Sequence, residues 1–431
     1  MKYFSTRDLK KNQPVSLKEA VLKGLADDGG LYMPEFLPKL SQEQILGLQQ
    51  QELPEIATRL LHVLMGGEPD IRYLDAICRE VFNFPIPLVQ LSDQLYSLEL
   101  FHGPTLAFKD VGARFMARLM SLLMQESRKE VRVVVATSGD TGGAVAAGFH
   151  GVEGIRVFIL FPKGRVSLMQ QKQLTCWGDN ITAIEVDGSF DDCQLLVKQL
   201  LSEKADYPHF NLTSANSINI ARLLPQAVYY LYAWSRLGCK PGIGVSVPSG
   251  NFGNLTAGLI ACAAGVDISA FAASTNINDV VPQYLETGSF AARPSIQTIS
   301  NAMDVGNPSN FERLMHLFAT MPMKNRLHGF RFSDDETREA IRELSTQFNY
   351  SCDPHGAVAY LGLKGLLAGL PSLGKGIFLE TAHPAKFPEV VESCTGKAVE
   401  VPDRLAAFVE KKESFLVMEN NINKIRECIL T

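Results

Sequence analysis

Two segments of this 431-residue chain share one local plan, in which an apolar run leads through a glycine-rich loop into a stretch of small residues. The first is VVVAT-SGDTGG-AVAAGF at 133–149, and the second is GVSVP-SGNFGN-LTAGLIACAAG at 244–265. Each segment predicts a buried strand, a tight turn and a helix. The first turn of a helix offers N–H groups without internal partners and the positive end of the dipole, so each loop is a candidate anion site.

A tight strand-to-helix turn without a ligand explains one such loop about as well as an anion site does. Two of them in one chain favour a site between two domains. Neither loop is a nucleotide motif, because the GNFG of residues 250–253 does not fit GxGxxG. The run from Gly369 to Lys375 resembles a P-loop, but Gly376 replaces the Ser or Thr that must follow the lysine.

Short β-branched runs alternate with helical stretches from about residue 131 onward. This alternation predicts an α/β fold with parallel strands, and runs that are apolar on both faces indicate strands covered on both sides. The predicted strands are VRVVVAT (131–137), IRVFILF (155–161), ITAIEV (181–186), IGVSV (243–247) and SAFAAS (269–274).

The chain is long enough for two or three domains. We expect a mostly helical N-terminal segment over 1–95, where apolar residues have helical spacing. A smaller α/β domain with Lys109 and the SGDTG loop is predicted over 96–235. A larger α/β domain with the SGNFGN loop is predicted over 236–431, including the C-terminal tail. The boundary near 235 rests on LGCKPGIG, which interrupts the pattern.

Composition narrows the possible partners. Lys and Arg number 41 against 46 Asp and Glu, so no overall positive field attracts nucleic acid. The eight cysteines form no CxxC pair and no two histidines lie at close ligand spacing, so we predict no metal. The N-terminus has no apolar signal, and the longest apolar stretch, Leu255–Val266, is too short to span a bilayer. We expect a cytoplasmic protein with no membrane partner.

Lys109 begins an apolar stripe at helical spacing in the segment FHGPTLAFKDVGARFMARLMSLLM. The stripe continues through small or apolar residues, including Gly112, Ala113 and Met116. A buried ammonium is unfavourable unless it is paired or deprotonated, and a desolvated lysine of lowered pKa is what Schiff-base chemistry uses. A lysine whose stem lies on the apolar stripe while its ammonium reaches water is the alternative, which composition alone favours.

Several motifs in order resemble the threonine synthase family, whose members are pyridoxal-phosphate enzymes of the tryptophan-synthase-β fold group. The resemblance covers most of the chain, from SLKEAVLKGLADDGGLYMPE to about residue 400. It implies two open, twisted, mostly parallel sheets flanked by helices (PLP fold type II), with a mainly helical N-terminal segment. The motifs are FHGPTLAFKD, TSGDTG, NSINIAR, PSGNFGN, SNAMDVGNPSN and TAHPAKF.

The resemblance implies a pyridoxal 5'-phosphate site. Lys109 would form the Schiff base with the cofactor and shuttle protons, beside Phe108 and Asp140. Thr381 would hydrogen-bond the pyridine nitrogen, where a hydroxyl does not force protonation as a carboxylate would. A carboxylate at Asp140 would repel the phenolate oxygen of the cofactor unless one of them is protonated. The cofactor phosphate would be wrapped by Gly250, Asn251, Phe252, Gly253 and Asn254.

The resemblance also implies two substrate contacts. One holds the substrate carboxylate, and the other binds a substrate phosphate, for which a guanidinium is suited. For Arg222, a position on the helix surface is the alternative. His102, His355 and His383 are left out of catalysis, because a lone histidine is more often a turn residue. The carboxylate set is Thr137, Ser138, Gly139, Asp140 and Thr141, and the phosphate set is Asn216, Ser217 and Arg222.

The activity implied is conversion of O-phospho-L-homoserine and water to L-threonine and phosphate, by a monomer or homodimer. The alternatives within the fold group are a serine/threonine dehydratase and a β-replacement synthase, neither of which needs the phosphate set. A binding protein that lost catalysis is a further alternative. Retention of Lys109, SGNFGN and Thr381 together argues against it.

Overall fold

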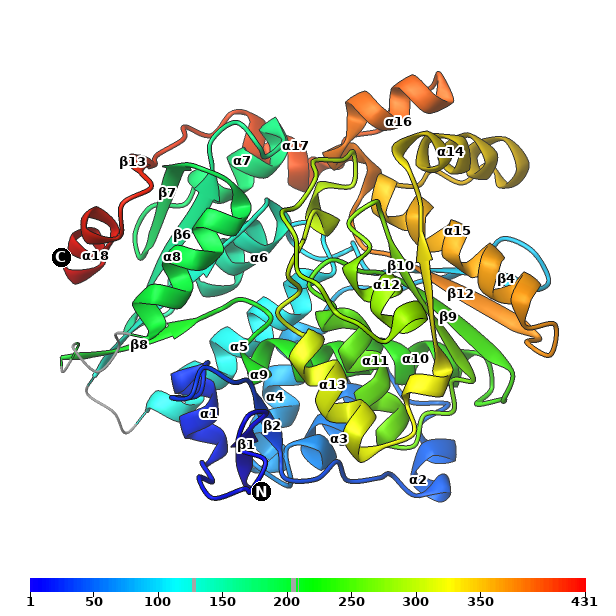
Figure 1. The fold of residues 1–431 in the computed structure, drawn as a ribbon, viewed down its shortest axis with the longest axis horizontal. Coiled ribbons are helices and arrows are strands. Elements are labelled where there is room, and N and C mark those ends of the chain that lie inside the picture. Colours follow the sequence, from blue (N-terminus) through cyan, green and yellow to red (C-terminus); the bar gives the residue numbers. More distant parts are fainter. Residues whose placement is uncertain (126–128, 203–206, 208) are drawn as a thin grey trace.

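The computed structural model describes residues 1–125, 129–202, 207 and 209–431. Its main body consists of two open sheets on opposite sides of the molecule, with helices α5 (Lys109–Met124) and α9 (Ile220–Leu223) between them (Figure 1). The five-stranded sheet has the order β13-β7-β6-β5-β8 and is parallel throughout. Its strands are β5 (Glu130–Ala136), β6 (Ile155–Pro162), β7 (Ile181–Asp187), β8 (Phe210–Ser214) and β13 (Leu416–Glu419).

The six-stranded sheet has the order β11-β10-β9-β12-β4-β3, and only its edge strand β3 runs antiparallel to its neighbour. The two sheets confirm the predicted fold class. All five predicted strands form, each within one residue of its expected bounds at either end. The strands of this sheet are β3 (Leu88–Gln90), β4 (Leu95–Glu99), β9 (Ile243–Pro248), β10 (Ala270–Thr275), β11 (Leu327–Arg331) and β12 (Lys375–Glu380).

Both faces of each sheet are covered by helices, which explains the continuous apolar runs. In β5, Val133 and Val135 pack toward α5 and α6, whereas Val134 and Ala136 pack toward α8. In the six-stranded sheet one face packs on α10 (Ala227–Arg236) and α11 (Gly253–Ala263) and the other on α14 (Asp334–Phe348) and α15 (Pro354–Gly369). The helices beside the five-stranded sheet are α6 (Asp140–Phe149), α7 (Leu168–Thr175), α8 (Phe190–Ser202), α17 (Asp403–Val409) and α18 (Ile422–Leu430).

Small residues let α5 and α6 approach closely. A Cβ at Gly148 would lie 3.0 Å from the backbone carbon of Ala113, so a larger residue there would push the two helices apart. This packing fixes α5, and therefore Lys109, against the small-residue helix that follows the SGDTGG loop. The helices beside the six-stranded sheet are α10 (Ala227–Arg236), α11 (Gly253–Ala263), α12 (Val280–Thr287), α13 (Phe311–Thr320), α14 (Asp334–Phe348), α15 (Pro354–Gly369) and α16 (Pro388–Thr395).

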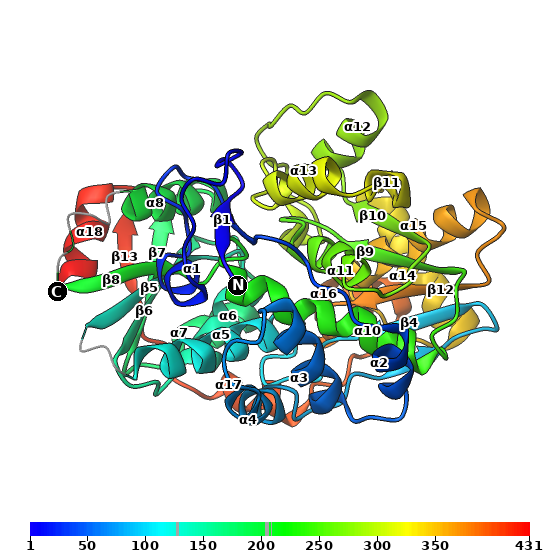
Figure 2. The same ribbon diagram turned by 90° about the horizontal axis from the view of Figure 1, so that it is seen from below.

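The N-terminal segment has less than half of its residues in helices and long irregular stretches between them, so it is less helical than predicted. It lies along the lower edge of the molecule in Figure 1 and faces the viewer in Figure 2. It also contributes strands, because β3 joins the six-stranded sheet through β4. The tail likewise differs from its expected place: β13 pairs with β7 of the five-stranded sheet, away from the sheet of its preceding segment. The remaining N-terminal elements are β1 (Tyr3–Ser5), α1 (Leu17–Lys23), β2 (Tyr32–Pro34), α2 (Gln42–Gly47), α3 (Leu53–Leu64) and α4 (Ile71–Val81).

The structure bears on two further expectations. All eight cysteines are free, four of them buried and four partly buried. Among the helices in the described part of the chain, none combines the length and the apolar character needed to cross a membrane.

Candidate active site

A cavity between the two sheets gathers most of the predicted site residues. It lies where the loops after β5, β9 and β12 meet, at the carboxyl ends of these parallel strands, which is where α/β folds bind ligands. The predicted residues that line it are Phe108, Lys109, Ser138, Asp140, Thr141, Asn216, Ser217, Arg222, Gly250, Asn251, Phe252, Gly253, Asn254 and Thr381.

Two residues predicted to bind the substrate carboxylate brace the loop from behind the cavity. The Thr137 hydroxyl accepts hydrogen bonds from the N–H groups of Gly139 (2.9 Å) and Gly142 (2.8 Å). Gly139 has φ +137°, a conformation that favours glycine, and a Cβ there would lie 2.4 Å from the Gln170 side chain. These contacts hold the loop turn that places Ser138, Asp140 and Thr141 at the cavity.

Lys109 begins α5 and faces the cavity. Burial lowers the pKa of its ammonium to about 8. Among the described residues, no carboxylate lies within ion-pair distance of the Lys109 Nζ, which lies 5.5 Å from the centre of the Phe108 ring. An amine of lowered pKa that faces a cavity is suited to act as a nucleophile and proton carrier.

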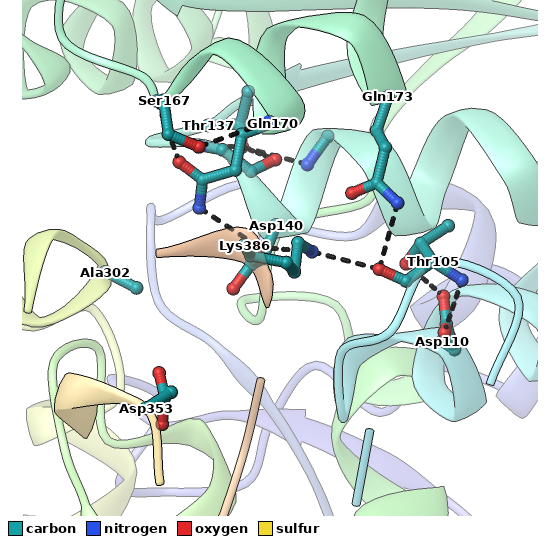
Figure 3. A network of polar contacts seen from close by, with 12 residues as sticks. Thr105, Asp110, Thr137, Asp140, Ser167, Gln170, Gln173, Ala302, Asp353 and Lys386 are labelled. Atoms are coloured by element: carbon teal, nitrogen blue, oxygen red, sulfur yellow. Dashed lines mark hydrogen bonds and ion pairs between the residues drawn. The ribbon is translucent and has the colours of Figure 1, made fainter. Parts of the chain in front are cut away.

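Asp140 is the first residue of α6 and is paired with a second lysine, Lys386. The Lys386 Nζ lies 2.6 Å from Asp140 Oδ1, and the Gln170 amide donates to the same oxygen at 3.1 Å (Figure 3). Burial alone would raise the pKa of Asp140, but the ammonium groups of Lys386 and Lys109 outweigh it and hold the pKa well below its ordinary value. Asp140 is therefore ionised at neutral pH.

The SGNFGN loop forms a cradle at the start of α11. Phe252 adopts a left-handed conformation (φ +59°), and the helix begins at Gly253 with no acidic residue in its first turn. A Cβ at Gly250 would lie 2.6 Å from the Ala302 carbonyl oxygen, so the backbone there has room only for glycine. The buried Asn254 Nδ2 has no hydrogen-bond partner. A helix N-terminus with a spare amide donor fits a phosphate, which agrees with the implied cofactor.

Thr381 directly follows β12 and lines the same cavity. Its carbonyl oxygen accepts a hydrogen bond from the Phe108 N–H at 2.9 Å, which ties the end of β12 to the residue before Lys109. This backbone hydrogen bond keeps Thr381 and Lys109 at the same cavity, where a hydroxyl and an amine could contact different sides of one cofactor ring.

Arg222 is almost fully buried at the cavity wall, contrary to the helix-surface alternative. One of its N–H groups donates to the Ala215 carbonyl, whereas its Nε has no partner. Burial lowers the pKa of this guanidinium to about 10. A buried cation with a spare donor and no acidic partner among the described residues is suited to bind an anion.

The other two residues of the predicted phosphate set differ from each other. The Asn216 side chain makes hydrogen bonds with both backbone groups of Ala136, at 3.0 and 2.7 Å, and accepts from Ser214, so it is a brace between two loops. The Ser217 hydroxyl accepts from Asn310 at 2.9 Å and keeps its own proton to donate. Ser217 and Arg222 are therefore the better placed for an anion.

Sequence reasoning missed three charged or titratable residues near the cavity. Lys386 lies within the TAHPAKF motif and could have been noted there. His355, set aside as a turn residue, lines the cavity, pairs with Asp353 and accepts from the Ala302 N–H at 3.2 Å. Arg313 is fully buried behind Ser217, whose carbonyl it binds at 2.9 Å. Nothing in its local sequence, NFERLMHLF, distinguishes it from a surface arginine.

The other two histidines lie outside the cavity lining. His102 Nε2 lies 2.6 Å from Glu99, and His383 accepts from the Ala385 N–H at 3.1 Å. Burial lowers the pKa of His383 to about 4, so this ring is neutral.

Comparison with known proteins identifies the family. Residues 82–379 match the model described as "Pyridoxal-phosphate dependent enzyme", residues 2–82 match "Threonine synthase N terminus" and residues 368–429 match "Threonine synthase, C-terminal". A threonine synthase of Haemophilus influenzae is 42% identical over 421 residues, covering 97% of each chain. This chain belongs to the threonine synthase family. The implied cofactor is confirmed as pyridoxal phosphate.

Solved structures of threonine synthases have the same fold as this chain. The crystal structure of the Escherichia coli enzyme superimposes with a TM-score of 0.94 at 39% identity, over 100% of this chain and 99% of that one. The PLP-bound enzyme of Brucella melitensis gives 0.90 at 36% identity, over 100% and 98%. The threonine synthase C-terminal match extends to residue 429, beyond residue 400, where the motifs of the sequence ended.

Proposed function

We propose that this chain converts O-phospho-L-homoserine and water to L-threonine and phosphate, with Lys109 as the Schiff-base lysine. The observation that carries the proposal is that Lys109 lines one cavity with two candidate anion sites, the start of α11 and Arg222. The proposed substrate carries a phosphate that leaves during the reaction, and pyridoxal phosphate carries a second phosphate that stays bound. A cavity with two candidate phosphate sites suits the binding of both molecules.

Bound pyridoxal phosphate supplies an electron sink for negative charge that develops on the substrate carbons. The SGNFGN backbone would hold the cofactor phosphate, and Thr381 would face the pyridine nitrogen. Ser138 and Thr141 would orient the substrate carboxylate through the loop that Thr137 braces. With its pKa near 8, Lys109 can take a proton from the substrate Cα and return one later.

Arg222 and Ser217 would bind the phosphate of the substrate and stabilise its charge as it leaves Cγ. The dehydratase and the β-replacement synthase need no such group, so Arg222 is the residue that favours the proposed substrate. Closure of the two sheets on the cavity would exclude water until Cβ is ready to accept it. The free thiols fit a reducing compartment, so we also propose that the enzyme acts in the cytoplasm.

The first test is to load the purified chain with pyridoxal phosphate, reduce it with borohydride and map the label. We expect a visible absorbance band that reduction abolishes, a label on Lys109, and phosphate release from O-phospho-L-homoserine. Lys109→Ala should remove all three. A label on another lysine would remove Lys109 from the proposed role. Turnover of serine without turnover of phosphohomoserine would favour the dehydratase.

The second test separates phosphate binding from the later steps. Arg222→Ala should lower kcat/KM for O-phospho-L-homoserine by about 10- to 150-fold, since a hydrogen bond to a charged group contributes about 1.5–3 kcal/mol. Turnover of vinylglycine, which has no phosphate, should fall much less. Arg118→Ala is the matched control, because Arg118 is half-exposed on α5 and pairs with Glu80. Equal losses with both substrates would remove Arg222 from the phosphate site.

A further inference from the structure

Two lysines and one carboxylate meet beside the cavity, and only one of the lysines is paired. Lys386, at the end of the short 3-10 helix η5 (Pro384–Lys386), is fully buried at 0% exposed. Its ammonium binds Asp140 Oδ1 at 2.6 Å and the Thr105 carbonyl oxygen at 2.9 Å. Lys109 is partly exposed to the cavity.

We propose that Lys386 is a positioning residue that keeps the Asp140 carboxylate paired and apart from Lys109, so that the Lys109 amine stays free to react. This inference rests on the proposed role of Lys109 as the Schiff-base lysine. Lys386 does not line the cavity, so it has no access to the substrate and acts through Asp140.

The arrangement of hydrogen bonds supports this pairing. Asp140 Oδ1 receives both the Lys386 ammonium and the Gln170 amide, and the Gln170 side chain is itself held through its Oε1 by the Ser167 N–H at 3.1 Å. In Figure 3 the Lys386 side chain reaches both Asp140 and the Thr105 carbonyl, which also accepts from Gln173 at 3.1 Å. The carboxylate is thus fixed on the side of α7 and η5.

The charges that face Lys109 come from four elements. Asp140 of α6 and Asp353, the N-cap of α15, favour its charged form, whereas Lys386 of η5 and Arg222 of α9 oppose it. The groups that act on the charge of Asp140 include the ammonium groups of Lys386 and Lys109 and the titratable ring of His355. If Lys386 lost its charge, the nearest cation left for Asp140 would be Lys109 itself. The ammonium form of Lys109 would then gain a buried partner, and the reactive amine would become scarce at neutral pH.

The test measures Lys109 alone, in the full-length chain freed of cofactor. Trace acetylation with acetic anhydride at a series of pH values, followed by mass spectrometry of the Lys109 peptide, gives the pH at which half of this amine is reactive. We expect about pH 8 for the unaltered chain. In Lys386→Met the midpoint should rise by about one unit or more, a tenfold loss of reactive amine at neutral pH. In Lys386→Met/Asp140→Asn, which lacks both charges, the midpoint should return to its original value.

Three further variants complete the design. Asp140→Asn alone should lower the midpoint, because Lys109 loses a carboxylate that favours its charged form. Lys386→Arg, which keeps the cation, should restore a midpoint close to that of the unaltered chain. Lys364→Met is the matched control, since Lys364 pairs with Glu343 on the surface at 2.8 Å, and should change nothing. If Lys386→Met does not fold, Asp140→Asn and the double variant still carry the test.

The outcomes distinguish this inference from the proposed function. An unchanged midpoint in Lys386→Met, with the borohydride label still on Lys109, would overturn only the inference. A borohydride label elsewhere would overturn the role of Lys109, whatever its acetylation profile.

Discussion

The two glycine-rich loops have the same plan but differ in the source of the negative charge beside them. The SGDTGG loop brings its own carboxylate, because Asp140 begins α6 and Lys386 keeps it ionised. The SGNFGN loop has Asn251 at the corresponding position, and α11 begins without any acidic residue in its first turn. One helix start is therefore neutralised from within the protein, whereas the other is left for an external anion.

An acidic side chain near the second loop differs from Asp140 as well. Asp304 follows the segment that contacts Gly250, and burial raises its pKa to about 6 despite hydrogen bonds from Thr298 and Asn276. No lysine or arginine among the described residues forms an ion pair with it. The carboxylate near the first loop therefore stays ionised in mildly acidic solution, whereas the carboxylate near the second loop takes up a proton near pH 6.

The largest expected effect comes from breaking the charge pair at the first loop. Asp140→Asn leaves Lys386 as a buried cation with only neutral partners, and removing one member of a buried pair typically costs about 3–5 kcal/mol. We expect a loss of this size in the free energy of unfolding, measured with urea on the cofactor-free chain at pH 7. The double variant with Lys386→Met should recover most of it. A loss under about 1 kcal/mol in the single variant would show that the pair contributes little.

The pH dependence of stability should have opposite signs at the two loops. Asp304 has a folded pKa of about 6, above the ordinary 3.8, so its folded form binds the extra proton and stability falls as pH rises from 4 to 6. The full effect is at most about 3 kcal/mol. Asp140 has a lowered pKa, so its contribution is present above pH 4 and is lost as pH falls below that value.

Urea titrations across pH 3–7 measure both contributions. In Asp304→Asn the fall between pH 4 and 6 should become shallower, while the loss of stability in more acidic solution remains. In Asp140→Asn the acid loss should become shallower and the fall above pH 4 should remain. The prediction fails if either variant alters the other pH range.

A smaller effect is expected from giving the second loop the charge of the first. Asn251→Asp is isosteric and keeps the oxygen that accepts from the Ser309 N–H at 3.2 Å. It adds a carboxylate beside the cradle, at a side chain to which no lysine or arginine of the described residues donates a hydrogen bond. Two like charges about 4 Å apart repel by about 1 kcal/mol in water and about 4 kcal/mol near a protein surface. An intermediate repulsion of about 1.4–2.7 kcal/mol should weaken the binding of pyridoxal phosphate about 10- to 100-fold.

Titration of the visible absorbance with added cofactor measures this change. Asn251→Ala removes the same amide without adding charge and serves as the control. If Asn251→Ala weakens binding as much as Asn251→Asp does, the lost amide rather than the added charge is responsible.

The sequence predicted this comparison only in part, and the limits have physical reasons. Four of the five predicted strands are rich in β-branched residues and the fifth, SAFAAS, in small ones, which are local patterns that can be read from the sequence. Strands β4 and β8 were missed because LYSLE and FNLTS contain polar residues, and their pairing depends on distant partners. The two loops and Lys109 were found from local patterns of small and apolar residues.

The contacts that decide the charge state of Asp140 and the role of Asn216 could not be predicted from the neighbouring sequence. The sequence raised the problem that a carboxylate at Asp140 would repel the cofactor, but its counter-ion Lys386 comes from the other end of the chain. In the same way, Asn216 has the residue type of a ligand contact, yet its amide braces the end of β5. The first contact depends on how the segment after β12 meets α6, and the second on the pairing of β5 with β8, neither of which a single motif encodes.

The smallest expected effect comes from removing the hydroxyl groups of Thr137, which precedes Gly139, and Ser249, which precedes Gly250. Thr137 serves the first loop with two accepted hydrogen bonds and one donated to the Gly139 carbonyl, whereas the Ser249 hydroxyl donates once, to the Val247 carbonyl at 2.9 Å. Thr137→Val leaves the buried Gly139 N–H without an acceptor and leaves the Gly142 N–H only the Gly139 carbonyl at 3.1 Å, so it should lower the free energy of unfolding by about 1–3 kcal/mol. Ser249→Ala should cost about 1 kcal/mol or less.

Urea unfolding of both variants, with the denaturant dependence required to match the unaltered chain, gives the two costs on one scale. Thr137→Ser is the matched control, because it keeps the hydroxyl and removes only a methyl group. A cost for Ser249→Ala equal to that of Thr137→Val would mean that the two loops are braced alike. A higher cost for Thr137→Val would show that the loop with its own carboxylate needs the firmer backbone support, since Asp140 must stay aimed at Lys386.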